Sequence, residues 1–472
     1  MPPETDRLRR ELLALPTLQR RPLHMPGHKR RVAPVPGLSV DWDITEVQGA
    51  DDLHYSDGIL TEAMERTAAL WGAARSWYLV NGSTCGILAG IAALASPGSP
   101  VICARNCHKA VFHALELGRL VPTWLLPPVD PDFGVFASVP PEAVERALRE
   151  TPGARAVILT SPTFDGCISD IAAIAALCHA RGVPLLVDEA HGAHLGLSPH
   201  FPAGALAAGA DVVIQSAHKT LPSLTQTALL HLSHGSLADP DRVERQLDIY
   251  ETSSPSYLLL SSLDGCTGLL AEHGAAWFSQ WRQRLDRFYA GAKSWKRLRL
   301  FTGGPAVYAH DPGKLLLNGA ALGFTGSALA EQLRAGGFEP EMVLGYNVLC
   351  MTSPCDAPDT LAQLGEALAS LDVQAEARAL PPLPALPEST PRRVLPPAEA
   401  AEAPAEDVPL DQAAGRTAAE AVWAYPPGVP MVLAGELLSP EVAALLSAWE
   451  TGGARLVRTG ARPLTKHIKC VK

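Results

Sequence analysis

LLVDEAHGAHLG, residues 185–196, is the stretch that decides the fold of this chain. It opens with a short apolar run that ends in Asp188, which is the pattern of a buried strand with a carboxylate at its carboxyl end. Burying an ionised carboxylate is unfavourable unless a cation meets it. Asp188 is therefore either the cap of a following helix or the partner of a bound cationic group.

Outward from this stretch, the same kind of run recurs along the first half of the chain. Strands are expected at residues 76–81, 100–105, 121–127, 154–160, 183–188, 210–216 and 227–233. Helical patterns lie between them at residues 83–96, 108–118 and 170–182. This alternation predicts an α/β fold with a mostly parallel, seven-stranded sheet covered on both faces, and ligands of such folds bind at the carboxyl ends of the strands.

QSAHKTLPS, residues 215–223, carries the second chemical signal. Of three His-Lys pairs in the chain, only His218-Lys219 follows a strand beside the one that ends in Asp188. A partly desolvated lysine amine has a lowered pKa and can form a Schiff base with an aldehyde, whereas an isolated lysine is usually a solvated surface residue. Together, Lys219 and Asp188 suggest pyridoxal 5'-phosphate (PLP), whose pyridinium nitrogen would be the cation that meets Asp188.

An anion site is expected in NGSTCG, residues 81–86, between a strand and a helix. Backbone N–H groups and the helix dipole at Gly82, Ser83 and Thr84 favour a phosphate there, although Ser or Thr at such a junction is often only a helix cap. Ser216 and His218 could add donors from the neighbouring strand ends.

Three further histidines follow predicted strands. His108 is expected either to stack on the cofactor ring or to cap the helix that it precedes. His191 is a further cofactor-binding candidate, and with His194 it forms an HGAH pair that invites a zinc hypothesis. No third ligand stands at a useful spacing, so no metal is expected.

Composition excludes several classes of protein. The net charge of -10 opposes nucleic-acid binding and would attract a cationic substrate. Nine cysteines without a C-x-x-C pair indicate reduced thiols and a cytoplasmic location. Neither a signal peptide nor an apolar stretch long enough to span a membrane is found in the sequence, so no membrane association is expected.

The 472 residues suggest several domains. The predicted boundaries are an N-terminal arm at 1–60, a PLP-binding major domain at 61–300, a small α+β domain at 301–374, a Pro/Ala/Glu-rich linker at 375–407 and a C-terminal domain at 408–472.

Several longer motifs, in order, resemble the Orn/Lys/Arg decarboxylases, which are PLP enzymes of fold type I with the aspartate-aminotransferase-like fold. They are PLHMPGHKR (22–30), DITEVQGADDLH (43–54), VNGSTCG (80–86), ARNCHKAV (104–111), SPTFDG (161–166), LLVDEAHGAHLG (185–196), QSAHKTLPSLTQTALLH (215–231), TSSPSYLLLSSLD (252–264) and GRTAAEAVWAYPPGVP (415–430). The chain looks like the short form of the family, without the N-terminal wing domain. One departure is Ala434 in MVLAGE, where relatives usually carry proline, which leaves the local turn open.

The resemblance implies a role for each candidate. Lys219 would carry the cofactor, Asp188 would face the ring nitrogen and His108 would stack on the ring. Ser83, Thr84, Ser216 and His218 would bind the phosphate. The segment Thr252, Ser253 and Ser254 would reach a neighbouring subunit's site, which implies a homodimer or a higher even homo-oligomer.

The implied reaction is decarboxylation of a basic L-amino acid to the amine and carbon dioxide, feeding polyamine synthesis. Arginine is favoured over lysine and ornithine because the chain looks like the short form, and Tyr425 and Glu436 are nominated to contact the substrate side chain. Two alternatives remain. DEAHG followed by a His-Lys pair also suits an α-oxoamine synthase, and the chain could be a catalytically inactive regulator that retains the fold.

Overall fold

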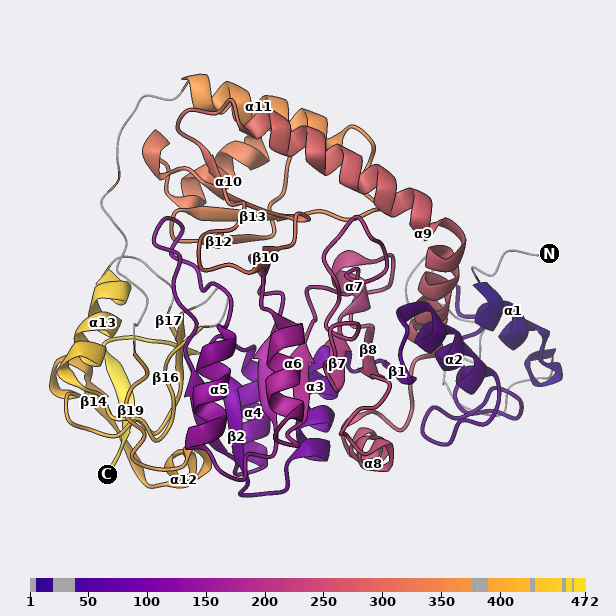
Figure 1. Cartoon of the computed structure of the whole chain (residues 1–472), viewed down its shortest axis with the longest axis horizontal. Coiled ribbons are helices and arrows are strands. Elements are labelled where there is room, and N and C mark those ends of the chain that lie inside the picture. Colours follow the sequence, from indigo (N-terminus) through magenta and orange to yellow (C-terminus); the bar gives the residue numbers. More distant parts are fainter. Residues whose placement is uncertain are drawn as a thin grey trace. The chain divides into compact units, whose positions relative to one another are not determined.

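The computed structural model describes residues 6–19, 39–374, 380, 389–424, 429–451, 456–460 and 462–472 (Figure 1). The chain divides into two compact units. Unit 1 comprises Met1–Leu94, Pro184–Arg282 and Ser353–Cys355, and unit 2 comprises Ala95–Val183, Gln283–Thr352 and Asp356–Lys472. Among the described helices, none combines the length and apolar content that crossing a bilayer requires.

A seven-stranded sheet forms the centre of the fold, in the order β1-β8-β7-β6-β4-β2-β3. Its strands are β1 (Arg75–Leu79), β2 (Pro100–Ala104), β3 (Val121–Leu125), β4 (Val157–Thr160), β6 (Leu185–Asp188), β7 (Val212–Gln215) and β8 (Ala228–Leu232). The β6–β7, β2–β3 and β2–β4 pairs are parallel, whereas β8 is antiparallel to both of its neighbours. All seven predicted strands and the mostly parallel sheet are confirmed.

The four strands of unit 1 are preceded and followed along the chain by helices. These are α1 (Arg7–Ala14), a 3-10 helix (Pro16–Gln19), α2 (Ile59–Trp71), α3 (Gly82–Leu94), α7 (Ala217–Thr220), α8 (Pro240–Tyr250) and the long α9 (Tyr257–Ala292), which continues into unit 2. Helix α3 lies very close to the sheet because two of its three glycines, Gly86 and Gly90, face the strands. A Cβ at Gly86 would meet Leu79 and Ile214, and one at Gly90 would meet Leu186.

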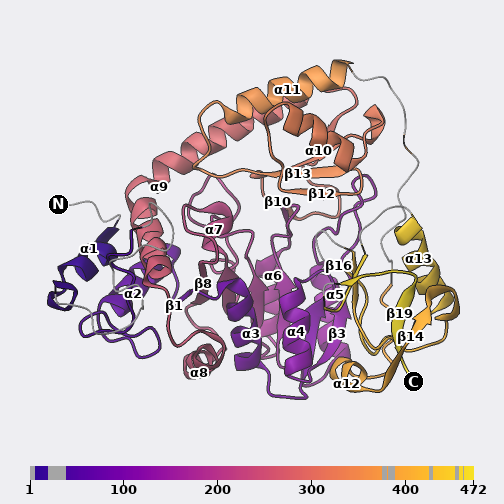
Figure 2. The ribbon, with the colours of Figure 1, turned by 180° about the vertical axis from the view of Figure 1, so that it is seen from behind.

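In unit 2, helices cover both faces of the strands that belong to it. They are α4 (Lys109–Leu117), α5 (Pro141–Glu150) and α6 (Ile171–His179). Helices α5 and α6 lie in front of the strands in Figure 1, and α4 comes forward when the molecule is seen from behind in Figure 2. Helix α6 begins where the Asp170 side chain accepts a hydrogen bond from Ala173 N–H, as an N-cap does.

Unit 2 also contains a second, antiparallel sheet in the order β12-β13-β11-β9. Its strands are β9 (Arg299–Leu300), β11 (Lys314–Asn318), β12 (Met342–Leu344) and β13 (Asn347–Met351). The helical segments in this region are a 3-10 helix (Ala320–Leu322), α10 (Gly326–Ala335) and α11 (Thr360–Gln374). A separate two-stranded pair joins β5 (Cys167–Ile168) to β10 (Ala309–His310).

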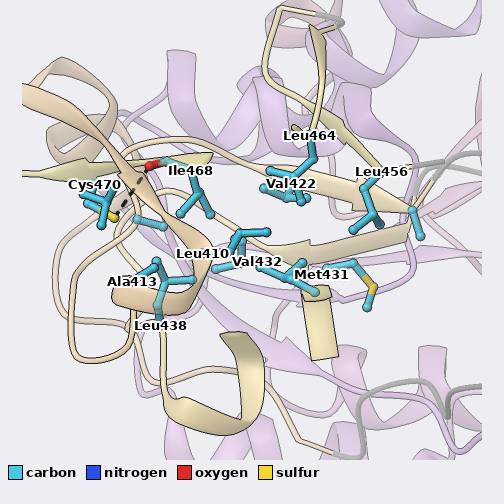
Figure 3. Close-up of a cluster of buried hydrophobic side chains, with 14 residues drawn as sticks. Leu410, Ala413, Val422, Met431, Val432, Leu438, Leu456, Leu464, Ile468 and Cys470 are labelled. Carbon is cyan, nitrogen blue, oxygen red and sulfur yellow. Dashed lines mark hydrogen bonds between the residues drawn. The ribbon is translucent and has the colours of Figure 1, made fainter. Parts of the chain in front are cut away.

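The C-terminal part of unit 2 has its own apolar core, where Val422, Leu456 and Leu464 meet Met431 and Val432 (Figure 3). Its elements are α12 (Pro397–Glu402), β14 (Ala405–Pro409), a 3-10 helix (Leu410–Gln412), β15 (Val422–Ala424), β16 (Val429–Val432), α13 (Pro440–Thr451), β17 (Leu456–Arg458), β18 (Arg462–Pro463) and β19 (His467–Val471). Strand β14 pairs with β19, and the other four strands form the order β16-β15-β17-β18.

The structure therefore places α12 and most of β14 inside the span 375–407 that was expected to be a linker. Pro397 occupies the first helical position, where its missing N–H matters least, and alanine and glutamate continue the helix. The turn around Ala434 is described as well. Gly435 supplies a left-handed conformation with φ +86°, so this turn forms without the proline of the relatives.

Candidate active site

Asp188 and Lys219 lie in the same part of unit 1, at the carboxyl ends of adjacent strands. Strands β6 and β7 are parallel, with Asp188 opposite Ile214 in the register. After β7, the single turn of α7 carries Lys219, whose Nζ lies 3.0 Å from Nε2 of His191. The expected neighbourhood of a lysine amine and a strand-end carboxylate is thus present, with a histidine added.

The Asp188 carboxylate is almost completely buried, with 2% of its surface exposed. Burial raises the pKa of Asp188 above its ordinary value, while the positive charge of Lys219 lowers it. Among the described residues the carboxylate accepts one hydrogen bond, from Ala190 N–H at 3.1 Å. An acid with so few donors in a dry site suits a cationic ligand atom.

Glu189, the next residue, was not singled out from the sequence. It is also buried, but its oxygens accept hydrogen bonds from Ala205 N–H and from Nε2 of Gln215, both at 2.7 Å. Burial, the largest cause, raises the pKa of Glu189 to about 8. Gln215 is the last residue of β7, and Glu189 directly follows β6. Their hydrogen bond therefore links the carboxyl ends of these two strands. Only the long-range pairing of β6 with β7 could have revealed it.

The predicted anion site lies at the start of α3, a helix of 13 residues. Gly82 has a left-handed conformation with φ +76°, which turns the chain from β1 into the helix. The Ser216 hydroxyl donates to the Ser83 hydroxyl at 2.9 Å, so these two expected phosphate ligands are adjacent. Thr84 is exposed in the first turn of the helix. Backbone N–H groups and hydroxyls at one helix N-terminus form a donor set for a phosphate.

His218 is held by its own loop, since its Nδ1 lies 2.8 Å from the Thr227 carbonyl oxygen. A carbonyl only accepts, so Nδ1 carries the proton of the neutral ring and Nε2 is then an acceptor. His218 can therefore donate from Nε2 to a phosphate only as an imidazolium.

His108 belongs to unit 2 and directly follows the turn after β2. It is the N-cap of α4, with Nδ1 accepting a hydrogen bond from Ala110 N–H at 3.2 Å. The capping contact is thus present, and the ring is exposed within this chain. Capping uses the ring edge at Nδ1, so it is compatible with the stacking role that the resemblance implies.

The HGAH pair diverges. His191 faces Lys219, whereas the buried His194 ring packs on Phe201 and Trp281 at centroid distances of 5.4 and 5.1 Å. Throughout the described parts of the chain, no three His, Cys, Asp or Glu side chains gather in a way that could hold a metal ion.

The remaining candidates are distributed as follows. Thr252, Ser253 and Ser254 lie between α8 and α9, and the Thr252 carbonyl oxygen is 2.9 Å from Nε2 of His54. Tyr425 lies outside the described residues. Glu436 is buried in unit 2 and forms a two-point ion pair with Arg105, at 2.6 and 2.8 Å.

The residues of unit 1 fit PLP in three respects. A buried carboxylate with one donor suits the ring nitrogen, the Lys219 amine suits the aldehyde, and the start of α3 with its serine pair suits the phosphate.

Comparison with known proteins agrees with this fit. The family model described as "Orn/Lys/Arg decarboxylase, major domain" matches residues 37–288, and the model of the C-terminal domain of the same family matches residues 385–456. The chain is 33% identical to an arginine decarboxylase of Bacillus subtilis over 446 residues, which cover 89% of this chain and 88% of that protein. It is also 33% identical to an arginine decarboxylase of Halalkalibacterium halodurans, over 88% of this chain and 87% of that one.

Among solved structures, a lysine decarboxylase of Francisella novicida superposes with a TM-score of 0.80 at 15% identity, covering 100% of this chain and 81% of that chain. This likeness confirms the fold type I architecture. The family matches decide against the α-oxoamine synthase. The chain belongs to the Orn/Lys/Arg decarboxylase family, whose members are PLP-dependent enzymes that decarboxylate basic amino acids.

Proposed function

We propose that this enzyme decarboxylates L-arginine in preference to L-lysine or L-ornithine. Support comes from the relatives named arginine decarboxylase, which match almost 90% of the chain. The amine product would then enter polyamine synthesis.

The arrangement of Asp188, Lys219 and His191 is the observation that carries the proposed residue roles. Lys219 binds the cofactor covalently through Nζ. Asp188 holds a proton on the ring nitrogen, and the few donors around its buried carboxylate favour that pairing. Gly82, Ser83, Thr84, Ser216 and His218 bind the phosphate. His108 stacks on the ring.

When bound, PLP supplies a sink for the electron pair that is left when the bond between Cα and the carboxylate breaks. The chain's own part is to place and move protons. Lys219 Nζ and His191 Nε2 lie 3.0 Å apart, within reach of a proton transfer between them. We assign to this pair the proton that Cα receives after carbon dioxide has left.

The proposal extends to assembly and location. Thr252, Ser253 and Ser254 would contribute to the site of a second subunit, so the enzyme would be a homodimer or a higher even homo-oligomer. Free cysteines, of which seven are buried, are in keeping with a reducing cytoplasm.

The direct test supplies purified holoenzyme with each of the three amino acids, labelled at the carboxylate. Released carbon dioxide and the amine product are then measured. We expect kcat/KM to be highest for arginine. A higher value for lysine or ornithine would overturn the substrate assignment while leaving the family chemistry intact.

Lys219→Ala is the matched test of the site. We expect turnover to fall by about 10³-fold or more, since both the covalent attachment and the proton carrier are lost. The visible absorption of the bound cofactor should change with it. Lys293→Ala, which removes an exposed lysine after α9, serves as the control and should behave like the wild type.

A further inference from the structure

The buried ion pair of Arg105 and Glu436 joins two distant parts of unit 2. Arg105 is the first residue after β2 and is 2% exposed, while Glu436 belongs to the C-terminal domain and is 1% exposed. Nη1 and Nη2 of Arg105 meet Oε1 and Oε2 of Glu436 at 2.6 and 2.8 Å, a parallel two-point contact. Such geometry fixes the orientation of both groups as well as their distance.

Each partner is also held from its own side. The Arg105 guanidinium lies 4.9 Å from the centre of the Trp124 ring on β3, and Arg105 N–H donates to the Leu125 carbonyl at 2.7 Å. Oε2 of Glu436 accepts a second hydrogen bond, from Leu433 N–H at 2.8 Å. The ion pair therefore joins two side chains that further contacts hold in place.

Burying two charges is seldom the most stabilising choice, because a well-packed apolar pair of similar size does as well or better. What such a pair does supply is a defined geometry. The carboxylate of Glu436 already accepts three hydrogen bonds, so a substrate cation is not needed to satisfy it. These contacts favour a positioning role over a role in binding the substrate.

The segment that this pair fixes leads directly to His108. Two residues separate Arg105 from His108, which caps α4 through Ala110 N–H. Further along α4, the Phe112 ring contacts Trp124 at 5.6 Å and Trp423 of the C-terminal domain at 5.0 Å. The segment from Arg105 into α4 is thus held by the ion pair and by an aromatic cluster, and Trp124 contacts both.

We infer that the Arg105–Glu436 pair is a positioning device for the reaction. By fixing the end of β2 to the C-terminal domain, it sets the turn before α4 and with it the orientation of the His108 ring. The inference rests on the proposed stacking of His108 on the cofactor.

Full-length holoenzyme carrying Glu436→Gln tests this, because the amide keeps the shape and loses the charge. We expect kcat to fall by about 10- to 100-fold, as small displacements of active-site groups do, with KM changed by less than about threefold. The circular dichroism of the bound cofactor in the visible range should also change, since it reports the asymmetry of the ring environment. Arg105→Lys, which retains the charge and loses the two-point contact, should give the same pattern.

Glu402→Gln is the matched control. Arg119 and Glu402 also pair through two contacts, at 2.7 and 2.9 Å, and connect the region after α4 to α12, but both are exposed. This variant should keep wild-type kcat, KM and dichroism.

A double variant separates the possible outcomes. If the pair acts through His108, then Glu436→Gln adds no further loss of kcat or dichroism in a His108→Ala background. Additive effects would overturn the inference, and so would a raised KM with altered preference among basic amino acids, which would make Glu436 a substrate contact. Should His108→Ala alone leave dichroism and kcat unchanged, the proposed stacking itself would fail. If Glu436→Gln does not fold, Arg105→Lys is carried through the same cycle.

Discussion

At the scale of single residues, the site contains two neighbouring buried acids, Asp188 and Glu189, which differ in the hydrogen-bond donors and charges around them. Within the described part of the chain, Asp188 has one hydrogen-bond donor and a nearby lysine charge, whereas Glu189 has two donors and no cation among the causes of its raised pKa. The first is suited to meet a cationic ligand. The second is suited to hold a proton and to link two strand ends.

Asp188→Asn should separate function from stability. An amide cannot hold a proton on the ring nitrogen, so we expect kcat to fall by about 10²- to 10⁴-fold and PLP to bind more weakly. The cofactor-free protein should be at least as stable as the wild type, because a buried and poorly solvated carboxylate is removed. Kinetics, a PLP titration and thermal unfolding of the cofactor-free form measure the three effects. A variant with wild-type kcat would contradict the assignment of Asp188.

Glu189 makes stability depend on pH. Its pKa of about 8 in the folded protein lies above the ordinary value of 4.5, so the folded state retains a proton that the unfolded state has already lost. Its contribution is fully present below about pH 4.5 and is lost as the pH rises towards 8. The free energy of unfolding should therefore fall across this window, by up to about 1.4 kcal/mol per pH unit from this group.

Glu189→Gln should flatten that dependence. Its amide can still accept from Ala205 N–H, and its NH₂ can donate to Gln215 Oε1 after a half-turn of the Gln215 amide. Urea unfolding of the cofactor-free protein at several pH values is the measurement. Asp165, also buried and with a pKa raised to about 7, leaves part of the slope in place. Glu150→Gln, an exposed change on α5, should keep the wild-type slope, and an identical slope in Glu189→Gln would refute the assignment.

At the scale of elements, the sheet could be predicted because its strands are buried on both faces. Runs such as VVIQ in β7 and LLVD in β6 have no solvent-facing positions, so the apolar signal is continuous. The observed strands are shorter than expected by one to three residues at several ends. Asp211 shows why, since its side chain accepts hydrogen bonds from Leu185 N–H and Leu237 N–H outside the ladder.

Strand β14 could not be predicted in the same way. Its sequence AEDVP is exposed at three of five positions and ends in proline, so it lacks both the alternation and the β-branched content of a typical strand. It exists because β19 pairs with it from Ala405 to Pro409. A partner more than 50 residues away is invisible to a local pattern.

Two glycines of the C-terminal domain give a matched test of its packing. Both have left-handed backbone conformations, with φ +86° at Gly435 and +85° at Gly415. A Cβ at Gly435 would overlap the Leu395 carbonyl oxygen, whereas one at Gly415 would meet nothing within 4 Å. Gly415→Ala should thus lower stability by about 1 kcal/mol through backbone strain alone.

Gly435→Ala should lower the free energy of unfolding by about 3 kcal/mol or more, because the backbone must also move. Chemical unfolding monitored by tryptophan fluorescence compares the two. Since Gly435 precedes Glu436, the larger change should also reduce kcat. Equal losses of stability in the two variants would mean that the backbone around Leu395 moves away from the new Cβ at no cost in free energy.

At the scale of the whole molecule, many of the candidate site residues could be predicted from the sequence, but the side-chain contacts between them could not. Asp188, Lys219, Ser83 and Ser216 could be chosen because parallel strands bring their carboxyl ends to one edge. The pairing of Arg105 with Glu436 spans 331 residues and depends on how the C-terminal domain packs, which no motif encodes. Glu436 was accordingly nominated as a substrate contact, whereas the structure surrounds its carboxylate with protein donors.

At the level of the assembly, we expect each active site to be shared between two subunits. If Thr252, Ser253 and Ser254 complete the site of the other subunit, a dimer contains two sites, each built from Lys219 of one copy and this segment of its neighbour. A heterodimer of Lys219→Ala with a Thr252→Ala/Ser254→Ala chain then holds one intact site and one doubly altered site. Co-expression with two different tags and sequential purification isolates that species.

We expect the heterodimer to show about half of the wild-type activity, although both parent homodimers are impaired. A heterodimer of Lys219→Ala with wild type should show the same half and serves as the reference. If the segment instead serves the site of its own chain, the heterodimer has no intact site, and its activity stays at about half that of the Thr252→Ala/Ser254→Ala homodimer. That result would place the segment with its own Lys219 and remove the reason for the enzyme to work as a dimer.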